Sequence, residues 1–442
     1  MTTLHILGAL LVIAAGLGWI SSRWLKLPVT IGSVLLTILF SLLLQAIGVR
    51  APSLHAWALR LVQQIHFGSL ILHGMLPMLL FAGAFLLDLE SLSQERLLIA
   101  LLSVPGVVLS TVAVAALMWL LLPLLGLYPL WLACLFFGAL ISPTDPIAVL
   151  EMLTRAGAPR HLQAQLAGES LFNDGIGAAI FLALLSASSG ARPTAFNIGW
   201  IFLLQVGGGV LLALFGASLA SFLMRRTQSY PVGILITLAL ALGGYALAEV
   251  LHLSAPMEAV TAGISLRRLL QGDSRQRSSL PSRSEPMDHK VIDRFWEVTD
   301  ELQNALLFVL LGLEVLSIPF RRGDLLLGLL AILMVLAVRV GVVSSMVGTV
   351  RALGLLSTSR KMRSPTAARP ADRLYGSSIA VLSWGGLRGG LGLALAFAVP
   401  STPANRWILP TTYIIVVFSI LVQGGSMNRL LRLRDRRNRS PR

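Results

Sequence analysis

Residues 168–175 read GESLFNDG and place two carboxylates, Glu169 and Asp174, in the middle of a long apolar segment. An ionisable side chain at the centre of a bilayer costs about 3 kcal/mol on insertion scales, so it indicates a functional site by default. Upstream, residues 142–146 read SPTDP and put a third carboxylate, Asp145, between two prolines of another apolar segment. A proline-broken helix and buried acids together predict an ion site inside a membrane fold.

The composition supports a membrane protein. Of the 442 residues, 55% are hydrophobic and only 12% are charged, and the mean hydropathy is +0.80. Soluble domains have about 25% charged residues. A spanning helix needs about 20 mainly apolar residues. Applying that length predicts an all-α polytopic membrane protein of about thirteen transmembrane helices, near 3–20, 30–48, 68–87, 97–123, 129–150, 162–187, 197–224, 231–250, 256–270, 295–318, 324–350, 375–399 and 408–426.

The distribution of basic residues predicts the orientation of the chain. Lys and Arg concentrate in cytoplasmic loops, and with the N-terminus outside those loops hold the basic stretches 267–294 and 351–373 and the arginine-rich tail. The C-terminus is therefore predicted to be cytoplasmic. The net charge of +15 follows largely from this asymmetry, which predicts contact with membrane lipid and no nucleic-acid partner. Because no basic segment precedes the first apolar run, that run is interpreted as a retained span.

The domain organisation is simple. Residues 1–426 form one predicted membrane domain, and residues 427–442 form a short basic cytoplasmic tail. A single cysteine, Cys134, excludes an intramolecular disulfide and a thiolate metal cluster. The sequence has no Gly-x-x-x-x-Gly-Lys-Ser/Thr phosphate loop, so we expect neither nucleotide use nor an enzyme activity.

Helical spacing separates the two acids of residues 168–175. Ser170 and Asp174 are four residues apart and share a helix face, so a hydroxyl and a carboxylate can bind one cation. These hard oxygen ligands suit Na⁺, Li⁺ or H₃O⁺. Glu169 projects about 100° away from Ser170 and is better placed to pair with a structural cation such as Arg388.

The two prolines of residues 142–146 create a second group of candidate ligands. They remove backbone donors and leave the carbonyls of residues 139–142 unpaired, which a membrane tolerates only around a buried site or cavity. We expect these carbonyls and the Thr144 hydroxyl to bind a cation. Asp145 can compensate the dipole at a half-helix N-terminus. The alternative is a simple proline kink beside a solvated aspartate.

A second interrupted segment, residues 383–390, reads SWGGLRGG. Its four glycines around Arg388 weaken the helix and allow another backbone to approach closely. In the thirteen-span count the two broken helices are the fifth and the twelfth, so they cross the membrane in opposite directions. Such a pair is typical of inverted repeats in secondary transporters, with the site where the two helices cross.

These motifs resemble those of a known family. Residues 138–149 (GALISPTDPIAV) and 168–175, Phe295-Trp296 followed by Asn304, and residues 384–389 (WGGLRG) resemble the monovalent cation:proton antiporters, in the branch of the NhaP-type and NHE-type sodium/proton exchangers. The resemblance covers nearly the whole chain. It implies a homodimer in the plasma membrane, the inner membrane of a bacterium. It also implies a core domain, with ion-binding helices around 68–187 and 295–399, that carries ions past a dimerisation domain.

The resemblance also implies a function and residue roles. It implies secondary active transport that exchanges Na⁺ (or Li⁺) for H⁺ and needs no cofactor, with Asp174 binding either ion by alternating access. The Asn-Asp form of residues 173–174 implies an electroneutral 1:1 exchange. In the implied site Na⁺ is bound by Asp174, Ser170, Thr144 and Asp145, while the structural residues are Asn173, which braces the broken helices, and Glu169, which pairs with Arg388.

Four positions, Ala82, Glu258, Glu314 and Arg339, are not explained by this family pattern. The family commonly has a glutamate where Ala82 stands, and small apolar residues where Glu258 stands. Glu258 either supplies the missing charge or has a structural role at a dimer or lipid interface. Glu314 and Arg339 are interpreted as a buried structural pair.

Two alternative functions remain at this point. A K⁺/H⁺ antiporter would use the same ligand types, and cavity size would decide between the two cations. An ion channel or a non-transporting membrane protein is the other alternative. A channel needs a continuous selectivity filter or a polar pore-lining helix, whereas the charges here concentrate at two broken helices.

Overall fold

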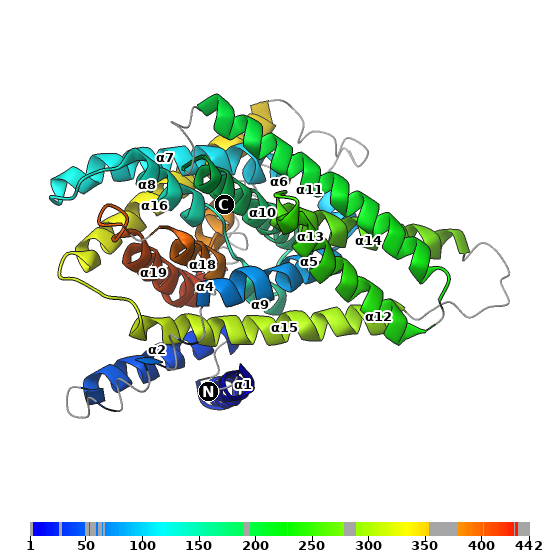
Figure 1. Cartoon of the computed structure of the whole chain (residues 1–442), viewed down its shortest axis with the longest axis horizontal. Coiled ribbons are helices and arrows are strands. Elements are labelled where there is room, and N and C mark those ends of the chain that lie inside the picture. Colours follow the sequence, from blue (N-terminus) through cyan, green and yellow to red (C-terminus); the bar gives the residue numbers. More distant parts are fainter. Residues whose placement is uncertain are drawn as a thin grey trace, which may run out of the picture.

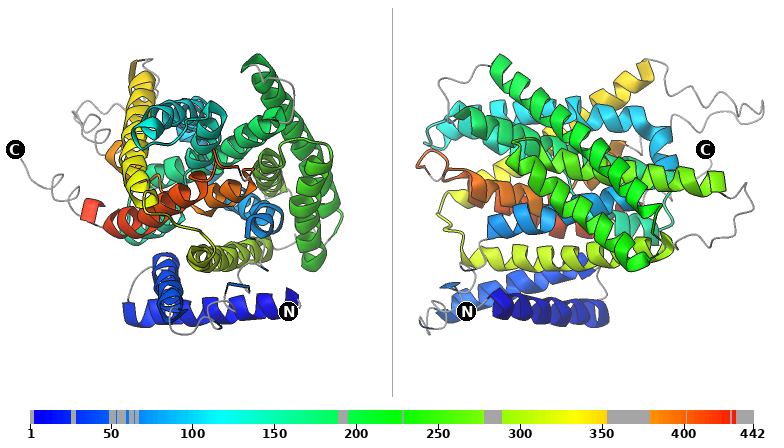
Figure 2. Two further views of the ribbon diagram at one scale, coloured as in Figure 1. Left: turned by 60° about the vertical axis from the view of Figure 1, so that its left-hand side comes forward. Right: turned by 45° about the vertical axis from the view of Figure 1, so that its right-hand side comes forward.

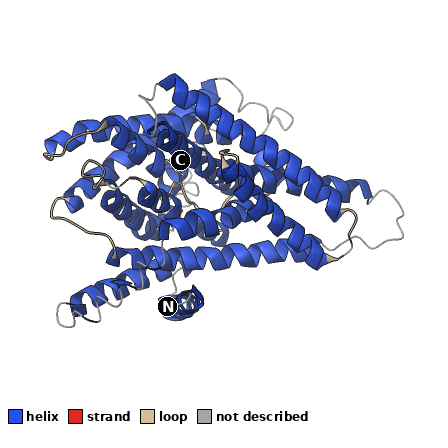
Figure 3. Ribbon diagram, viewed as in Figure 1, coloured by secondary structure: helices blue, strands red, loops and turns tan. Residues whose placement is uncertain are grey.

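The computed structural model describes residues 3–25, 29–48, 53, 59–60, 64, 67–188, 195–227, 229–277, 289–352, 379–400, 402–427 and 429–431. In these ranges the chain forms helices and connecting turns, and no strand (Figure 3). A bilayer favours this outcome because a helix satisfies its own backbone hydrogen bonds.

The α-helices vary widely in length. They are α1 Thr3–Ile20, α2 Val29–Gly48, α4 Phe67–Ser69, α5 Leu76–Leu86, α6 Leu89–Ser103, α7 Pro105–Leu124, α8 Trp131–Ile141, α9 Ile147–Arg155, α10 Arg160–Ser188, α11 Ala195–Met224, α12 Tyr230–Leu238, α13 Gly244–Val250, α14 Ala255–Arg277, α15 His289–Leu313, α16 Asp324–Ala352, α18 Gly390–Ala398 and α19 Ile408–Phe418. Four π-helical turns and one 3₁₀ turn extend or join them: η1 Ser21–Leu25, η2 Leu70–Met75, η3 Ala239–Gly243, η7 Ser419–Gly424 and η4 Glu314–Leu316.

All thirteen predicted spans contain helix, and several of them are subdivided. The predicted span 97–123 is part of α6 and α7, which meet at Val104, directly before Pro105. In the described part of the chain, nine helices are long and apolar enough to cross a membrane, or ten with the bent pair Ile379–Gly385 and Gly390–Ala398. The count of thirteen therefore stays a prediction.

The helices pack in successive layers (Figure 1). α14 lies between α11 on the outside and α5 on the inside, and α15 packs against α5 on one side and α2 on the other. α1 and α2 lie at the edge of the molecule beyond α15, as the turned views of Figure 2 also show. α7, α16 and α19 pack together in a further layer, in which α7 contacts α8 and α19 contacts α18. Between these layers lie the two interrupted helices.

Apolar side chains fill the space between the layers and also cover the outer surface. Buried aromatic residues join α5 to α15, where the rings of Phe81 and Trp296 are 4.8 Å apart. On α11, large apolar side chains such as Leu211 and Phe215 are each 70% exposed. An apolar surface of this kind is expected where a helix faces lipid or another subunit.

Candidate functional site

The two interrupted helices cross at their breaks. α8 ends at Ile141 and α9 begins at Ile147, while the helix Ile379–Gly385 is bent by 46° relative to α18. The Asp145 amide donates a 2.7 Å hydrogen bond to the Leu387 carbonyl, which joins the breaks directly. A Cβ at Gly389 would collide with the Asp145 side chain, and one at Gly392 would lie 2.6 Å from the Leu140 carbonyl oxygen. These two glycines therefore permit the close approach.

Arg388 holds the crossing together through backbone groups. Its Nη1 donates hydrogen bonds of 2.6 Å to the Ser142 carbonyl and 2.8 Å to the Pro143 carbonyl. Its own amide donates to the Ser419 hydroxyl at 2.8 Å. The carbonyls of residues 139–142 were expected to bind a cation, but in the structure that of Ser142 accepts a hydrogen bond from Arg388, as does that of Pro143. A buried guanidinium needs acceptors, and a helix break supplies them.

Polar side chains of α10 support the first break. Asn173 donates from Nδ2 to the Thr144 hydroxyl at 2.7 Å and accepts the Thr144 amide at 3.1 Å. The Ser170 hydroxyl donates to the Thr144 carbonyl at 2.5 Å. At the start of α9, the Asp145 carboxylate accepts the Ile147 amide at 3.1 Å, where it also faces the positive end of the helix dipole. The polar groups left by the prolines are thus largely satisfied by side chains.

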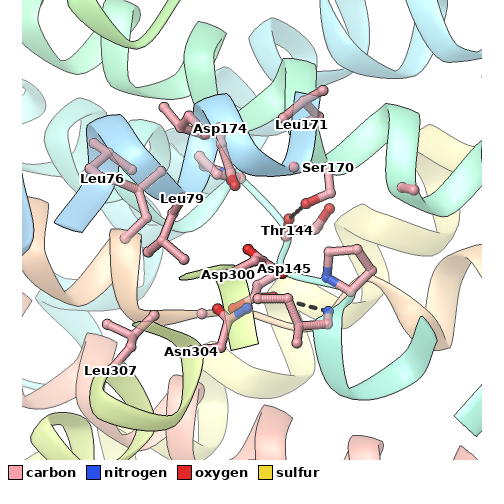
Figure 4. Close-up of a pocket in the computed structure, with 18 of the residues that line it drawn as sticks. Leu76, Leu79, Thr144, Asp145, Ser170, Leu171, Asp174, Asp300, Asn304 and Leu307 are labelled. Atoms are coloured by element: carbon pink, nitrogen blue, oxygen red, sulfur yellow. Dashed lines mark hydrogen bonds between the residues drawn. The ribbon is translucent and has the colours of Figure 1, made fainter. Parts of the chain in front are cut away.

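A cavity of about 280 Å³ lies beside the crossing. Its polar lining contains Asp174, Asp145, Thr144 and Ser170, the four residues for which the sequence predicts cation binding (Figure 4). Its apolar lining comes mainly from leucines, including Leu76, Leu79 and Leu80 of α5 and Leu307 of α15. The structure therefore brings the four predicted residues to one cavity, while their roles as ligands stay predictions.

The four residues present hard oxygen atoms to the cavity. Asp174 points into the cavity from α10, and Asp145 faces it from the break (Figure 4). The two carboxylates lie within electrostatic range of each other. Two like charges in one cavity favour the entry of a cation or a proton. The hydroxyls of Ser170 and Thr144 are neutral oxygen atoms of the hard type that Na⁺ prefers, and their binding of a cation stays a prediction.

Comparisons with known proteins identify the family. The family model described as "Sodium/hydrogen exchanger, transmembrane" matches residues 9–433. The chain belongs to this sodium/hydrogen exchanger family. It is 37% identical over 435 residues to the Na⁺/H⁺ antiporter NhaP of Pseudomonas aeruginosa, covering 97% of this chain and 96% of that protein. It is 29% identical to the Na⁺/H⁺ antiporter NhaH of Halobacillus dabanensis over 83% of each chain. The expected family resemblance is confirmed.

A solved structure supports the fold of this family member. The sodium proton antiporter MjNhaP1 from Methanocaldococcus jannaschii, solved at pH 8, matches with a TM-score of 0.69 over 98% of this chain and 100% of that chain. The sequence identity is 19%, so the match establishes the fold. The prediction of an all-α polytopic membrane protein is confirmed.

The predicted partner of Glu169 in this exchanger-family chain was wrong. Glu169 of α10 forms a bidentate ion pair with Arg339 of α16, in which Arg339 Nη1 bonds Oε1 and Nη2 bonds Oε2 at 3.0 Å. Arg339 also donates to the Leu382 carbonyl at 2.9 Å. Arg388 is held instead by the carbonyls of the first break. The position of Glu169 on its helix predicted that its side chain points away from that of Ser170. The sequence did not show which arginine lies next to Glu169.

The suggested pair of Glu314 and Arg339 was also wrong, because Arg339 is bonded to Glu169. Glu314 is 4% exposed and accepts a hydrogen bond from the Ser317 hydroxyl, one helical turn further along. Burial makes such a local partner necessary. Glu314 lies at the end of α15, where η4 begins.

Glu258 and Ala82, the two departures from the family pattern, lie away from the cavity lining. Glu258 is 0% exposed on α14, and its carboxyl group packs against Gly244 at the start of α13. Neither of its oxygens has a hydrogen-bond partner in the described part of the chain. Ala82 is also 0% exposed and packs in an apolar cluster with Phe81 and Phe85 of the same helix.

Asp300, which no sequence motif singled out, lines the cavity from α15 together with Asn304. Asp300 lies among other acids, such as Glu297 and Glu301, in the more polar half of that helix, where solvent-exposed charges are common. The available signal was its spacing of four residues from Asn304, because such a pair shares a helix face.

Proposed function

We propose that this protein is a secondary active transporter, and not an enzyme, which exchanges Na⁺ or Li⁺ for H⁺ across the membrane. The observation that supports this proposal is the cavity at the crossing of the broken helices, where Asp174 and Asp145 meet the hydroxyls of Ser170 and Thr144. Membership of the sodium/hydrogen exchanger family and relatives named Na⁺/H⁺ antiporters support the same conclusion.

The proposed mechanism is competition for Asp174. Its carboxylate oxygens bind either Na⁺ or H⁺, so the arrival of one ion releases the other. The loaded site then opens alternately to the two sides of the membrane. A 1:1 exchange moves no net charge. A tenfold gradient of one ion is worth about 1.4 kcal/mol and can drive a tenfold gradient of the other, so the exchange needs neither ATP nor a cofactor.

The cellular arrangement is part of the same proposal. The positive charges of the predicted cytoplasmic loops support an N-terminus outside and a C-terminus inside. Relatives from bacteria support a place in the bacterial inner membrane, and a homodimer is proposed from the family resemblance. The transport of Na⁺ and H⁺ would then contribute to pH homeostasis.

Purified protein in liposomes provides the test. We expect an imposed pH gradient to collapse when Na⁺ or Li⁺ is added, as measured with an entrapped pH-sensitive dye. Asp174→Ala should abolish the response because it removes the carboxylate for which Na⁺ and H⁺ compete in the proposed mechanism. Glu297→Gln, which removes an exposed carboxylate on α15, is the matched control and should keep wild-type exchange.

Three outcomes have different meanings in this assay. Full exchange by Asp174→Ala would overturn the assignment of the site. A wild-type protein that responds to K⁺ but not to Na⁺ or Li⁺ would be a K⁺/H⁺ antiporter. Ion flux without coupled proton movement would indicate a channel.

A further inference from the structure

The cavity contains a second group of polar residues, on the side of α15. Asp300 and Asn304 of this helix both line it, and the Asn304 amide lies within reach of the Asp300 carboxylate on the preceding turn. Figure 4 shows both side chains beside Asp145, while Asp174 enters the cavity from a different helix, α10. The side of the cavity formed by α5 is apolar, with Leu76, Leu79 and Leu80. The third carboxylate of the cavity therefore comes from α15.

Asn304 has an unused ligand atom. Its side chain is 4% exposed, and Oδ1 has no hydrogen-bond partner among the described residues. By contrast, the side chain of Asn173 uses both its oxygen and its nitrogen to hold Thr144. A buried amide oxygen without a donor costs about 1–3 kcal/mol, and a cation bound in the cavity would offset this cost. Amide and carboxylate oxygens are suitable ligands for a hard cation.

The three carboxylates do not form one compact centre. In the ranges that the structure describes, no group of three acidic or other metal-binding side chains is close enough to hold one metal ion. Asp145 is instead within electrostatic range of both Asp174 and Asp300. This arrangement divides the cavity into two neighbouring acidic positions with Asp145 between them.

The charge balance of the cavity favours cations at both positions. Among the described residues, three carboxylates line it with one guanidinium, that of Arg388, whose Nη1 is already bonded to two backbone carbonyls. The nearby Glu169 and Arg339 neutralise each other. Like charges in a confined site with apolar walls raise the local concentration of the counter-ion.

We propose that Asp300 and the Asn304 amide oxygen form, with Asp145, a second cation subsite, where Na⁺ is held before it reaches Asp174. This inference rests on the proposed Na⁺/H⁺ exchange and adds a residue that determines the apparent affinity for the cation. Both positions share Asp145, so Na⁺ can pass from one position to the other while it stays bound to a carboxylate oxygen of Asp145.

The first test is the dependence of exchange on Na⁺ concentration in liposomes. Asp300→Asn keeps the size of the side chain and removes its charge, and we expect the KM for Na⁺ to rise about fivefold, which corresponds to ~1 kcal/mol. The maximal rate should stay within about twofold because Asp174 is intact. Asp300→Glu should return the KM to near the wild-type value. Asn304→Leu should also raise the KM for Na⁺.

The matched control is Glu297→Gln, which removes an exposed carboxylate on the same helix. We expect its KM to equal that of the wild type, because Glu297 is absent from the cavity lining. An unchanged KM in Asp300→Asn, or an equal rise in Glu297→Gln, would overturn the subsite while leaving Na⁺/H⁺ exchange in place.

A binding measurement separates this inference from the proposed function. In detergent, Na⁺ titrated against the purified wild-type protein should raise its unfolding temperature, and Asp300→Asn should need about fivefold more Na⁺ for the same rise. If the wild type shows no exchange, the proposed function fails and this titration still decides the subsite. Identical Na⁺ titrations of the two proteins would refute it.

Discussion

At the crossing of the broken helices, Glu169 is 1% exposed and is bonded by both terminal nitrogens of Arg339. Between α11, α13 and α14, Glu258 is 0% exposed and neither of its oxygens has a hydrogen-bond partner in the described residues. The two acids are equally buried but differ in their surroundings. Removing one partner of a buried ion pair lowers the free energy of unfolding, because the other charge is left unpaired. A buried acid without a partner already lowers the free energy of unfolding of the wild-type protein. Mutation should therefore affect the two regions in opposite directions.

The largest effect is expected from Glu169→Ala. It leaves Arg339 charged and buried without its carboxylate, which should lower the free energy of unfolding by about 3–5 kcal/mol. A denaturant titration in mixed micelles measures this change. The double variant Glu169→Leu/Arg339→Met removes both charges and should recover a large part of the loss. If the single variant were as stable as the wild type, the comparison between the two regions would fail.

A smaller effect is expected from Gly389→Ala, which tests the backbone contact at the crossing. The added methyl group would collide with the Asp145 side chain, so the two breaks would have to separate, at a cost of about 1–3 kcal/mol. Because Asp145 lines the cavity, exchange in liposomes should also be lost. The control is Gly425→Ala, where a Cβ meets no atom within 4 Å. Equal behaviour of the two variants would show that the close approach is unimportant.

The smallest effect, and the only stabilising one, is expected from Glu258→Met. An apolar side chain of similar length removes an unpartnered carboxyl group, which should raise the free energy of unfolding by about 1 kcal/mol. Thermal unfolding in detergent measures the gain, and Glu249→Gln on a partly exposed helix end is a control expected to change little. A marked destabilisation would mean that Glu258 has a partner in the membrane, and the contrast with Glu169 would disappear.

Much of the fold followed from local features of the sequence. Hydropathy located helix in every predicted span, and the prolines of residues 142–146 and the glycines around Arg388 located both breaks. These signals are local because a proline or a glycine acts on its own helix. The cavity-lining positions of Ser170 and Asp174 agree with their helical spacing, which is also a local property.

The ion-pair partners could not be predicted in the same way. Glu169 and Arg339 are 170 residues apart in the sequence, and Arg339 and Arg388 were both plausible partners for a buried acid. The choice depends on how α10 and α16 are each placed against α6, and hydropathy contains no information on that packing. Asp300 was missed for a related reason, since only the packing of α15 against α5 and α18 makes it part of the cavity.

The backbone of the first break has a consequence for the hydration of an entering ion. The carbonyls of Ser142 and Pro143 accept from Arg388, and that of Thr144 accepts from Ser170. A cation in the cavity therefore meets mainly side-chain oxygens, in contrast to the carbonyl rings that strip potassium in channel filters. With four oxygen-bearing side chains at the proposed Asp174 site, we expect a bound ion to keep some of its water molecules. On this expectation, transfer between the two faces moves a partly hydrated ion, and carboxylate charge contributes to the choice of cation together with cavity size.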